Sequence, residues 1–574
     1  MQCIVRASCN RVFIFSNALS DSSSPVACCS KFYVHFENHL FISNLQFMKT
    51  SSLFILYLMI FFSFSLDAQN APPVITSILV QFESSTNELV VYYNLQDTEN
   101  DNIDITFLLS DDGGATYLTE PANATGHVGF PIAPGTGKQI RWNIGSINDI
   151  FNYSVRLVAN DRQTPGIETL VAQVDSNRLL TDLQMIEGTR HYQANPTHLE
   201  EIKDTIEDRF ERAGLQTRRQ DVVAGGYTGH NIIGRLPGLG NEAITYIIDG
   251  HFDTVDDAPG ADDNGSAVAG VLEALRILAP HNFEKSITFI GFDFEEAVGL
   301  FGLNGSRDYV QSGRLPYETV EGVINFEMIG YYSNEVNTQT LPTGFGTLFP
   351  TATATVTADS FRGNFITNVG DTESEMLWGA YDTAIARYVP NLKSVSLLVS
   401  GDGLLTPDLR RSDHAPFWDD DVPALMLTDG ANFRNPNYHT PNDTSGSLNY
   451  TFMSRVVAAS IATIAELAGW QNSTYKDASI FPAGIEGIQS SCTIEVSPNP
   501  SEGELTIQIG SCFRKATTLS LYAMDSKLIL KRQENQTNSE ITLILPPDLQ
   551  NGLYFIILNN GRVAGSERVV LNRK

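Results

Sequence analysis

Several short segments of the chain bring carboxylate and imidazole side chains together, most of them directly after an apolar run. They are Asp-Gly-His-Phe-Asp at 249–253, Asp-Asp-Asn-Gly at 262–265, Asp-Phe-Glu-Glu at 293–296, Asn-Phe-Glu at 325–327 and Tyr-His at 438–439. Zinc accepts imidazole nitrogen and carboxylate oxygen, and a catalytic zinc keeps one position free for water. Two such ions about 3.5–4 Å apart share a water and a carboxylate, which acidifies the water and polarises a carbonyl. The residue types therefore favour a two-metal hydrolase site, with one uncoordinated carboxylate left to accept the proton of the water.

Each of these motifs has a commoner explanation when it occurs alone. His251 next to Asp253 is typical of a hydrogen-bonded pair. Glu295 and Glu296 are typical of an exposed acidic turn, and residues 262–265 suit a turn and helix cap. The metal interpretation depends on the occurrence of all the motifs in one order. Five histidines without a motif are expected to be ordinary polar residues: His127, His191, His198, His230 and His281.

Strand-like and helix-like runs alternate through the middle of the chain and lead into these motifs. Strands are expected at 243–248, 286–292, 323–328 and 424–427, and helices at 266–278, 302–310 and 450–467. This alternation predicts an α/β domain, a mostly parallel sheet with helices on both faces. Ligands bind at the carboxyl ends of such strands, so we expect the motifs to converge there. Residues 331–411 are expected to build much of the cleft rim.

The flanking segments have the period of two that is typical of β-strands. Residues 70–165 predict an N-terminal β-sandwich of the immunoglobulin or fibronectin type, and residues 488–574 predict a small C-terminal all-β domain. The α/β domain between them is assigned to residues 175–470. One of its helices is expected to begin with a capping box formed by Thr197 and Glu200.

The beginning of the chain has the features of a secretory signal peptide. Lys49 precedes an apolar run from Leu53 to Leu66, which a small residue, Ala68, follows closely. The run is shorter than the about 20 residues that a membrane-spanning helix needs, so no stable membrane span is expected. We therefore assign residues 48–68 to a cleaved signal peptide. Residues 1–47 are interpreted as a spurious or unstructured leader, because an export signal belongs at the start of a chain.

Composition narrows the classes of function. The chain has 574 residues, of which 42% are hydrophobic and 18% charged, which is typical of folded domains. Its 37 Lys and Arg residues against 66 Asp and Glu residues give a net charge of −29. Such a surface repels polyanions, so no nucleic acid partner is expected. The absence of cysteine between residues 70 and 490 excludes thiol catalysis and a zinc–cysteine site there.

The motifs of the α/β domain resemble those of the zinc aminopeptidases of peptidase family M28, in the same order. The resemblance implies two Zn²⁺ ions and five ligands: His251 and Glu327 on one ion, Glu296 and His439 on the other, and Asp263 as the bridge. It implies that Glu295 is the general base, which deprotonates the bridging water and later delivers a proton to the leaving amine. Glu327 departs from the family pattern, because many members have Asp there and the extra methylene changes its reach.

The same resemblance implies supporting roles for four further residues. Tyr438 corresponds to a family tyrosine whose hydroxyl stabilises the oxyanion. Asp253 is expected to hold His251 in its metal-binding tautomer. Asp443 and His414 are expected behind the ligands, or on the cleft wall in the case of His414, rather than on a metal.

The implied activity is that of a secreted di-zinc aminopeptidase, a metallo-exopeptidase that removes N-terminal residues from peptides or proteins. One alternative is another enzyme of the M28 type, a carboxypeptidase or a glutaminyl-cyclase-like enzyme. A second alternative is a catalytically silent surface-binding protein on the same scaffold. Such proteins lose ligands, whereas all five ligands and the base are present here, which favours the hydrolase.

The C-terminal segment resembles the sorting domain of the type IX secretion pathway of Bacteroidetes. The resemblance rests on Ser-Pro-Asn-Pro at 497–500, Leu-Ser-Leu-Tyr at 519–522, Asn-Gly-Leu-Tyr at 551–554 and the final Val-Val-Leu at 569–571. It implies the type IX machinery as a partner and export through the outer membrane, to a secreted or cell-surface location. Whether Cys492 and Cys512 pair in that oxidising setting is left open.

Overall fold

The computed structural model describes residues 70–147, 150, 153–298, 301–482, 490–491, 494–509, 513, 517–523, 528–534, 540–559 and 563–573. The predicted leader (1–47) and signal peptide (48–68) lie outside the described residues, as do Cys492 and Cys512. Within the described part of the chain, no helix is both long enough and apolar enough to cross a membrane.

The middle of the chain forms an eight-stranded mixed sheet in the order β15-β14-β16-β13-β10-β12-β9-β8. Its strands are β8 (Gln216–Ala224), β9 (Tyr227–Leu236), β10 (Asn241–His251), β12 (Lys285–Phe292), β13 (Thr319–Glu327), β14 (Ile366–Gly370), β15 (Ser394–Leu398) and β16 (Ala424–Thr428). The four central strands, β16, β13, β10 and β12, run parallel to one another. On one side of these strands, β9 is antiparallel to both β12 and β8. On the other side, β14 is antiparallel to β16. The parallel centre is the part that the alternating sequence pattern predicts.

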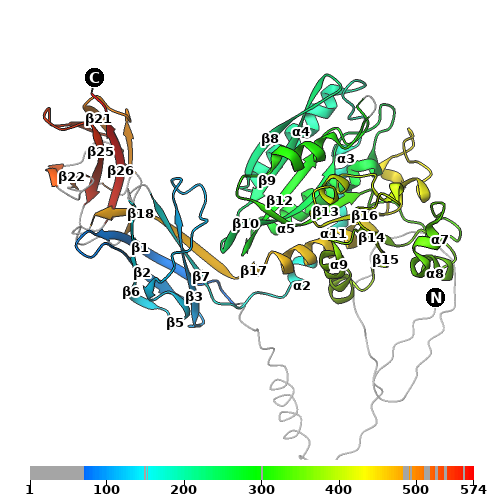
Figure 1. Cartoon of the computed structure of the whole chain (residues 1–574), viewed down its shortest axis with the longest axis horizontal. Helices are drawn as coiled ribbons and strands as arrows, with labels where there is room; N and C mark the ends of the chain where they lie inside the picture. Colours follow the sequence, from blue (N-terminus) through cyan, green and yellow to red (C-terminus); the bar gives the residue numbers. More distant parts are fainter. Residues whose placement is uncertain are drawn as a thin grey trace, which may run out of the picture. The chain divides into compact units, whose positions relative to one another are not determined.

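Helices cover both faces of this sheet, so the predicted α/β fold is confirmed (Figure 1). One face packs against α3 (Ser176–Ile186), α4 (Pro196–Arg212), α5 (Ala267–Leu278), α9 (Glu375–Tyr388) and α11 (Tyr450–Leu467). The other face packs against α8 (Pro350–Ala358), α10 (Ala415–Trp418) and the π-helical turn η3 (Tyr309–Gly313). Successive residues of a strand point to opposite faces, so Ile247 and Ile248 of β10 are both fully buried, in different cores.

Short elements complete the domain. They are α2 (Glu168–Val171), η2 (Ala261–Ser266), β11 (Asn282–Phe283), α6 (Asn304–Asp308), α7 (Phe345–Leu348), η4 (Pro407–Leu409), η5 (Ala431–Phe433), η6 (Ser445–Ser447) and β17 (Trp470–Gln471). The helix expected at 302–310 is formed by α6 followed by η3. Strands β10, β12 and β13 begin one to four residues earlier than expected. Residues 331–411 contribute β14, α9 and β15 to the sheet and its cover, in addition to a cleft wall.

The start of α4 differs from the prediction. The side chain of Asn195, rather than Thr197, caps the helix by accepting a hydrogen bond from the backbone N–H of His198 at 3.3 Å. Pro196 occupies the first helical turn, where its missing N–H has no intrahelical partner in any case. This proline fixes the start of the helix two residues earlier than the capping-box pattern indicates, so that prediction is wrong.

A second eight-stranded sheet, in the order β4-β6-β2-β1-β18-β7-β3-β5, is built mainly from residues 74–160. Its strands are β1 (Val74–Glu83), β2 (Glu88–Gln96), β3 (Ile103–Ser110), β4 (Thr125–Gly126), β5 (Gly129–Ile132), β6 (Gly135–Asn143), β7 (Ser154–Asn160) and β18 (Ser473–Pro482). Buried side chains from β1, β2, β3 and β7 share one core. The prediction for residues 70–165 did not include β18, which follows the α/β domain and pairs with both β1 and β7.

The C-terminal part is all β, as predicted. A five-stranded sheet, β19-β26-β25-β22-β23, and a three-stranded sheet, β20-β21-β24, share one apolar core. The strands are β19 (Ser490–Ser491), β20 (Ile494–Ser497), β21 (Glu504–Ile509), β22 (Thr517–Ala523), β23 (Leu528–Glu534), β24 (Glu540–Ile544), β25 (Gly552–Asn559) and β26 (Val563–Leu571).

Candidate metal centre

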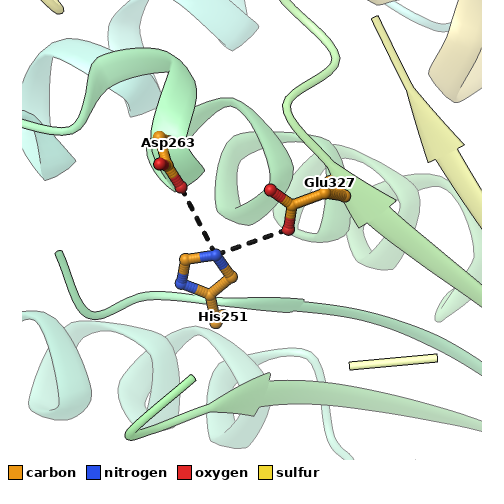
Figure 2. Close-up of side chains that lie close together, drawn as sticks. All are labelled: His251, Asp263 and Glu327. Carbon is orange, nitrogen blue, oxygen red and sulfur yellow. Dashed lines mark ion pairs between the residues drawn. The ribbon is translucent and has the colours of Figure 1, made fainter. Parts of the chain in front are cut away.

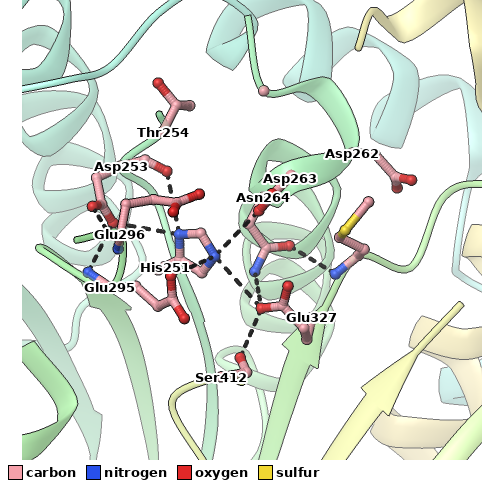
Figure 3. A network of polar contacts seen from close by, with 12 residues as sticks. His251, Asp253, Thr254, Asp262, Asp263, Asn264, Glu295, Glu296, Glu327 and Ser412 are labelled. Carbon is pink, nitrogen blue, oxygen red and sulfur yellow. Dashed lines mark hydrogen bonds and ion pairs between the residues drawn. The ribbon is translucent and has the colours of Figure 1, made fainter. Parts of the chain in front are cut away.

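The ends of three adjacent parallel strands bring the predicted ligands together. His251 is the last residue of β10, and Glu327 is the last residue of β13. On the other side of β10, β12 ends at Phe292, directly opposite His251, and leads within a few residues to Glu295 and Glu296. These side chains and those of the η2 turn form the network in Figure 3. The convergence follows from the parallel order of the strands, whose carboxyl ends lie along one edge.

His251, Asp263 and Glu327 form the first of two groups that could hold a metal ion (Figure 2). The Nε2 atom of His251 lies 3.5 Å from Asp263 Oδ1 and 3.5 Å from Glu327 Oε2. His251 is completely buried, yet its Nε2 atom has no hydrogen-bond partner among the described residues. A buried polar atom without a partner is costly, and a cation between these three groups would satisfy it. The donor set therefore fits a metal ion.

Asp263, Glu296 and His439 form the second group. The Nε2 atom of His439 lies 2.9 Å from Asp263 Oδ2 and 3.2 Å from Glu296 Oε1. The two oxygen atoms of Asp263 therefore face different histidines, Oδ1 toward His251 and Oδ2 toward His439. A carboxylate in this position suits a bridge between two ions.

Glu295 belongs to neither group but lies beside both. Its Oε2 atom is 3.8 Å from His251 Nε2. Its backbone N–H and that of Glu296 each donate to one oxygen of Asp253, both at 3.1 Å. Asp253 also lies beside the other imidazole nitrogen of His251, since Asp253 Oδ1 is 3.4 Å and its backbone oxygen 3.2 Å from Nδ1. One buried carboxylate thus links the histidine to the turn that carries both glutamates.

Two side chains that the sequence does not single out hold Glu327. Ser412 donates its hydroxyl to Glu327 Oε2 at 2.7 Å, and Asn264 donates its amide to the same oxygen at 3.3 Å. Asp443 acts similarly on Asp263, because its carboxylate accepts the backbone N–H groups of Asp262 and Asp263 at 3.0–3.1 Å. The only signals in the sequence that could have indicated them are the position of Ser412 two residues before His414 and that of Asn264 directly after Asp263.

Gly260 allows the tight turn that presents Asp263. Its φ angle is +60°, a region that residues with a side chain rarely adopt. A Cβ atom there would lie 2.3 Å from Thr254 Cγ2 and 2.5 Å from the backbone oxygen of Asp263. A larger residue would therefore push against the backbone of Asp263.

Tyr438 lies against His439, with the two rings stacked 3.8 Å apart at an angle of 17°. The hydroxyl oxygen of Tyr438 accepts a hydrogen bond from Arg411 Nη2 at 2.8 Å. His414 lies apart from both groups. It is completely buried, donates from Nε2 to the backbone oxygen of Leu409 at 2.9 Å, and packs edge-on against Trp418. Burial lowers the pKa of His414 to about 3, so it is a neutral core residue.

Burial and neighbouring carboxylates raise the pKa values of Glu295 and Glu296. Burial raises the pKa of Glu295 well above its ordinary value, and the carboxylates of Glu296 and Glu327 add to the effect. Burial and the charge of Asp263 raise the pKa of Glu296 to about 7. Burial lowers the pKa of His439, but its contacts with Asp263 and Glu296 outweigh this and raise it to about 10. Such a concentration of carboxylates favours the binding of divalent cations, whose positive charge stabilises the ionised form of these groups.

Two connected hollows adjoin the site. The first is an open cleft, whose empty space is about 900 Å³ and whose lining includes Asp263, Glu295, Glu296 and His439. The second is an apolar pocket of about 710 Å³, part of it open to solvent. Glu327, Arg411 and Tyr438 line both. The apolar lining of the pocket includes Phe345, Val356, Phe365, Val395, Leu397 and Met426.

Two family models match the chain. The model described as peptidase family M28 matches residues 231–464, which contain all five predicted ligands. The model described as a secretion system C-terminal sorting domain matches residues 495–572.

Curated relatives match the α/β domain. The uncharacterized protein YfbL of Escherichia coli is 30% identical over 272 residues, which cover 46% of this chain and 79% of YfbL. Aminopeptidase YwaD of Bacillus subtilis is 28% identical over 38% of this chain, but the match spans only 40% of YwaD. Among solved structures, the LapA aminopeptidase of Legionella pneumophila is 22% identical, with a TM-score of 0.41 over 53% of this chain and 73% of LapA.

Proposed function

Because the chain belongs to peptidase family M28, we propose that it is a secreted aminopeptidase that uses two zinc ions to remove N-terminal residues from peptides. The observation that carries the proposal is the pair of ligand groups that share Asp263, with the uncoordinated Glu295 beside them. A peptidase of this kind needs both ions and a separate carboxylate base. The activity of the whole protein and the choice of substrate belong to this proposal.

The identity of the metal is inferred from the ligands. Each group offers one imidazole and two carboxylates, which is the mixture of nitrogen and oxygen donors that zinc accepts. Purely oxygen sites favour magnesium or calcium instead. No cysteine lies between residues 30 and 491, so thiolate ligands play no part in this domain. We therefore propose that His251 and Glu327 hold one Zn²⁺, Glu296 and His439 the other, and Asp263 both.

The chain's own residues then divide the catalytic work. The zinc pair, when bound, would polarise the carbonyl of the scissile bond and make the attacking water more acidic. Glu295 accepts the proton of that water, and its pKa, raised by burial, suits it to return the proton to the leaving amine. The hydroxyl of Tyr438, at the wall between the cleft and the apolar pocket, donates a hydrogen bond to the developing oxyanion. Asp253 keeps the imidazole of His251 oriented.

The apolar pocket supports a preference for large apolar N-terminal residues. It opens beside Glu327 and Tyr438, so a side chain next to the scissile carbonyl can enter it. Phe365, Val395, Leu397 and Met426 in its lining are each less than a tenth exposed. The transfer of a side chain the size of leucine or phenylalanine from water to such a surface stabilises binding by about 1.5–3 kcal/mol. The carboxylates at the pocket mouth suit the positive charge of a free α-amino group.

A panel of aminoacyl reporter substrates tests this function. We expect turnover of leucyl and phenylalanyl reporters, loss of turnover on chelation, and recovery on addition of Zn²⁺. Glu295→Gln should reduce kcat by about 10²- to 10⁴-fold, whereas Glu211→Gln, an exposed change on α4, should leave kcat unchanged. Turnover that resists chelation would rule out the metal mechanism. Activity only on N-blocked peptides would favour a carboxypeptidase, and tight peptide binding with no turnover would favour a silent binding protein.

The proposed location follows from the C-terminal sorting domain. We propose that residues 488–574 direct the chain through the type IX machinery and that the signal at 48–68 first takes it across the inner membrane. Expression in a host with that machinery tests this, by comparing the full chain with a chain that ends at residue 487. The full chain should reach the medium or the cell surface, and the shortened chain should stay in the periplasm. Equal export of the two would contradict the proposal.

A further inference from the structure

Arg411 is a cation on the wall between the metal-binding cleft and the apolar pocket, and none of the proposed catalytic roles uses it. It is exposed, and its guanidinium group contacts the residue proposed as the oxyanion donor. Its Nη2 atom donates to the hydroxyl oxygen of Tyr438 at 2.8 Å, and its Nη1 atom donates to Asn432 Oδ1 at 3.0 Å. The two contacts fix the plane of the guanidinium group.

The chemistry of this contact determines how the phenol can act. A guanidinium group has five N–H donors and no acceptor, so the oxygen of Tyr438 must accept. The hydroxyl proton of Tyr438 therefore takes no part in the contact. Among the described residues, no other group accepts a hydrogen bond from it. The proton is free to point into the hollow that Tyr438 lines.

The ring of Tyr438 is fixed from a second side. It stacks on the imidazole of His439, and the carbon atom of the Arg411 guanidinium lies 5.7 Å from the centre of the phenol ring. Burial raises the pKa of Tyr438 well above its ordinary value, and the nearby carboxylates add to this, whereas the charge of Arg411 acts in the opposite direction. A neighbouring cation polarises the O–H bond and makes it a stronger donor.

We propose that Arg411 is a positioning residue that holds Tyr438 as a hydrogen-bond donor to the reacting carbonyl. This inference rests on the proposed function and deepens it. Residue 412, the next along the chain, holds the metal-binding carboxylate of Glu327. Arg411 thus supports the site through the proposed oxyanion donor, Tyr438, and Ser412 supports it through Glu327.

A double-mutant cycle between Arg411→Met and Tyr438→Phe tests the proposal. Each single change should lower kcat on leucyl-4-nitroanilide, by roughly ten- to a hundredfold for Arg411→Met and about a hundredfold for Tyr438→Phe. KM should change little. In the Tyr438→Phe background, Arg411→Met should have almost no further effect, because there is then no hydroxyl to position. Arg411→Lys should restore only part of the activity, since an ammonium group lacks the planar fork.

Arg307→Met is the matched control for the loss of a cleft cation. Arg307 lines the same cleft, but the only hydrogen bond of its side chain within the described residues is to the backbone oxygen of Gly302, at 3.2 Å. Whatever the size of its effect, it should add to that of Tyr438→Phe. A binding measurement supplies a readout independent of turnover. Arg411→Met should weaken a tetrahedral boronic acid analogue by the same factor as kcat/KM, and leave the zinc content and Tm unchanged.

Two results would overturn the proposal. The first is additivity of Arg411→Met and Tyr438→Phe. The second is a loss that appears only in KM, and only for peptides with a free C-terminal carboxylate, because Arg411 would then be a substrate anchor. Either result leaves the proposed function intact as long as the unaltered enzyme hydrolyses aminoacyl reporters in a zinc-dependent way. If it does not, the function fails first.

Discussion

The two ligand groups share Asp263 but differ in how the protein holds them. In the group around His251, the two residues besides Asp263 stand at strand ends, and all three side chains are at most 10% exposed. In the group around His439, the ligands stand on loops, and the imidazole of His439 is 35% exposed. We refer to these as the buried group and the open group.

The buried group also has more hydrogen bonds behind it. Ser412 and Asn264 hold Glu327, and Asp253 lies against the far nitrogen of His251. His439 has no hydrogen bond to its Nδ1 atom within the described residues and is positioned by its stack on Tyr438. Outer partners orient ligands and raise metal affinity. We therefore expect an ion in the buried group to be held more tightly, and an ion in the open group to face the cleft that His439 lines.

Removal of the carboxylate that the two groups share should have the largest effect. Asp263→Asn should abolish binding of both ions, because each group then keeps only one carboxylate and one imidazole. Activity should fall by about 10⁴-fold or more, since the acidification of water is lost. Zinc content by mass spectrometry, together with kcat, measures this. Retention of one ion at full occupancy would show that Asp263 serves a single group.

Stepwise metal removal should separate the groups without any mutation. In a chelator titration of the native chain we expect one ion to leave at a concentration roughly 10- to 100-fold below the other. His439→Gln should lose only the weakly held ion and keep the tightly held one, which assigns the first step to the open group. Isothermal titration of the apoprotein with Zn²⁺ gives both affinities. Loss of both ions in one step would contradict the difference inferred from burial.

Three of the candidate ligands, His251, Glu296 and Glu327, could be expected to converge because the sequence places them at or just beyond the ends of apolar strands. Asp263 and His439 stand more than ten residues beyond a strand, and only the family resemblance pointed to them. A run such as 243–248 predicts a buried parallel strand, and the residues after it must lie at the functional edge of the sheet. The same reasoning applies to Glu296 and Glu327. It does not predict the positions of Arg411 and Ser412, because they lie in a loop whose path depends on tertiary contacts made far along the chain.

Parts of the fold could not be predicted from the sequence for a similar reason. Strand β18 pairs with β1 in the N-terminal sheet although it begins about 390 residues after β1 ends, and Ile480 lies in register with Val80. Exposed and half-buried residues alternate along residues 474–479, but this period indicates only a strand and not the partners with which it pairs. The helix cap at Asn195 was missed at short range, because Thr197 and Glu200 fit the capping-box spacing while Pro196 decides where the helix starts.

Asp253→Asn should affect both groups, but less than the loss of Asp263. An amide offers only one acceptor to the two backbone N–H groups of Glu295 and Glu296, and its NH₂ faces one of them. We expect kcat/KM to fall by about 10- to 100-fold and both zinc affinities to weaken. Competition with a fluorescent chelator measures the two affinities separately. If only the affinity of the buried group changes, Asp253 acts through His251 alone.

Ser412→Ala should have the smallest effect, a loss of metal affinity that is confined to the buried group. The change removes the 2.7 Å hydrogen bond to Glu327 Oε2 but leaves the amide of Asn264 in contact with the same oxygen. A hydrogen bond to a charged group contributes about 1.5–3 kcal/mol. Because Asn264 still contacts the same oxygen, we expect the lower end of this range, a fall of roughly tenfold in the affinity for the tightly held ion. The affinity for the weakly held ion should stay the same. Ser312→Ala is the matched control, because the only hydrogen bond of its hydroxyl in the described part of the chain is to the backbone oxygen of Asp308. Equal weakening of both ions by Ser412→Ala would mean that the two groups respond as one unit, in which case the difference in burial does not govern how they bind metal.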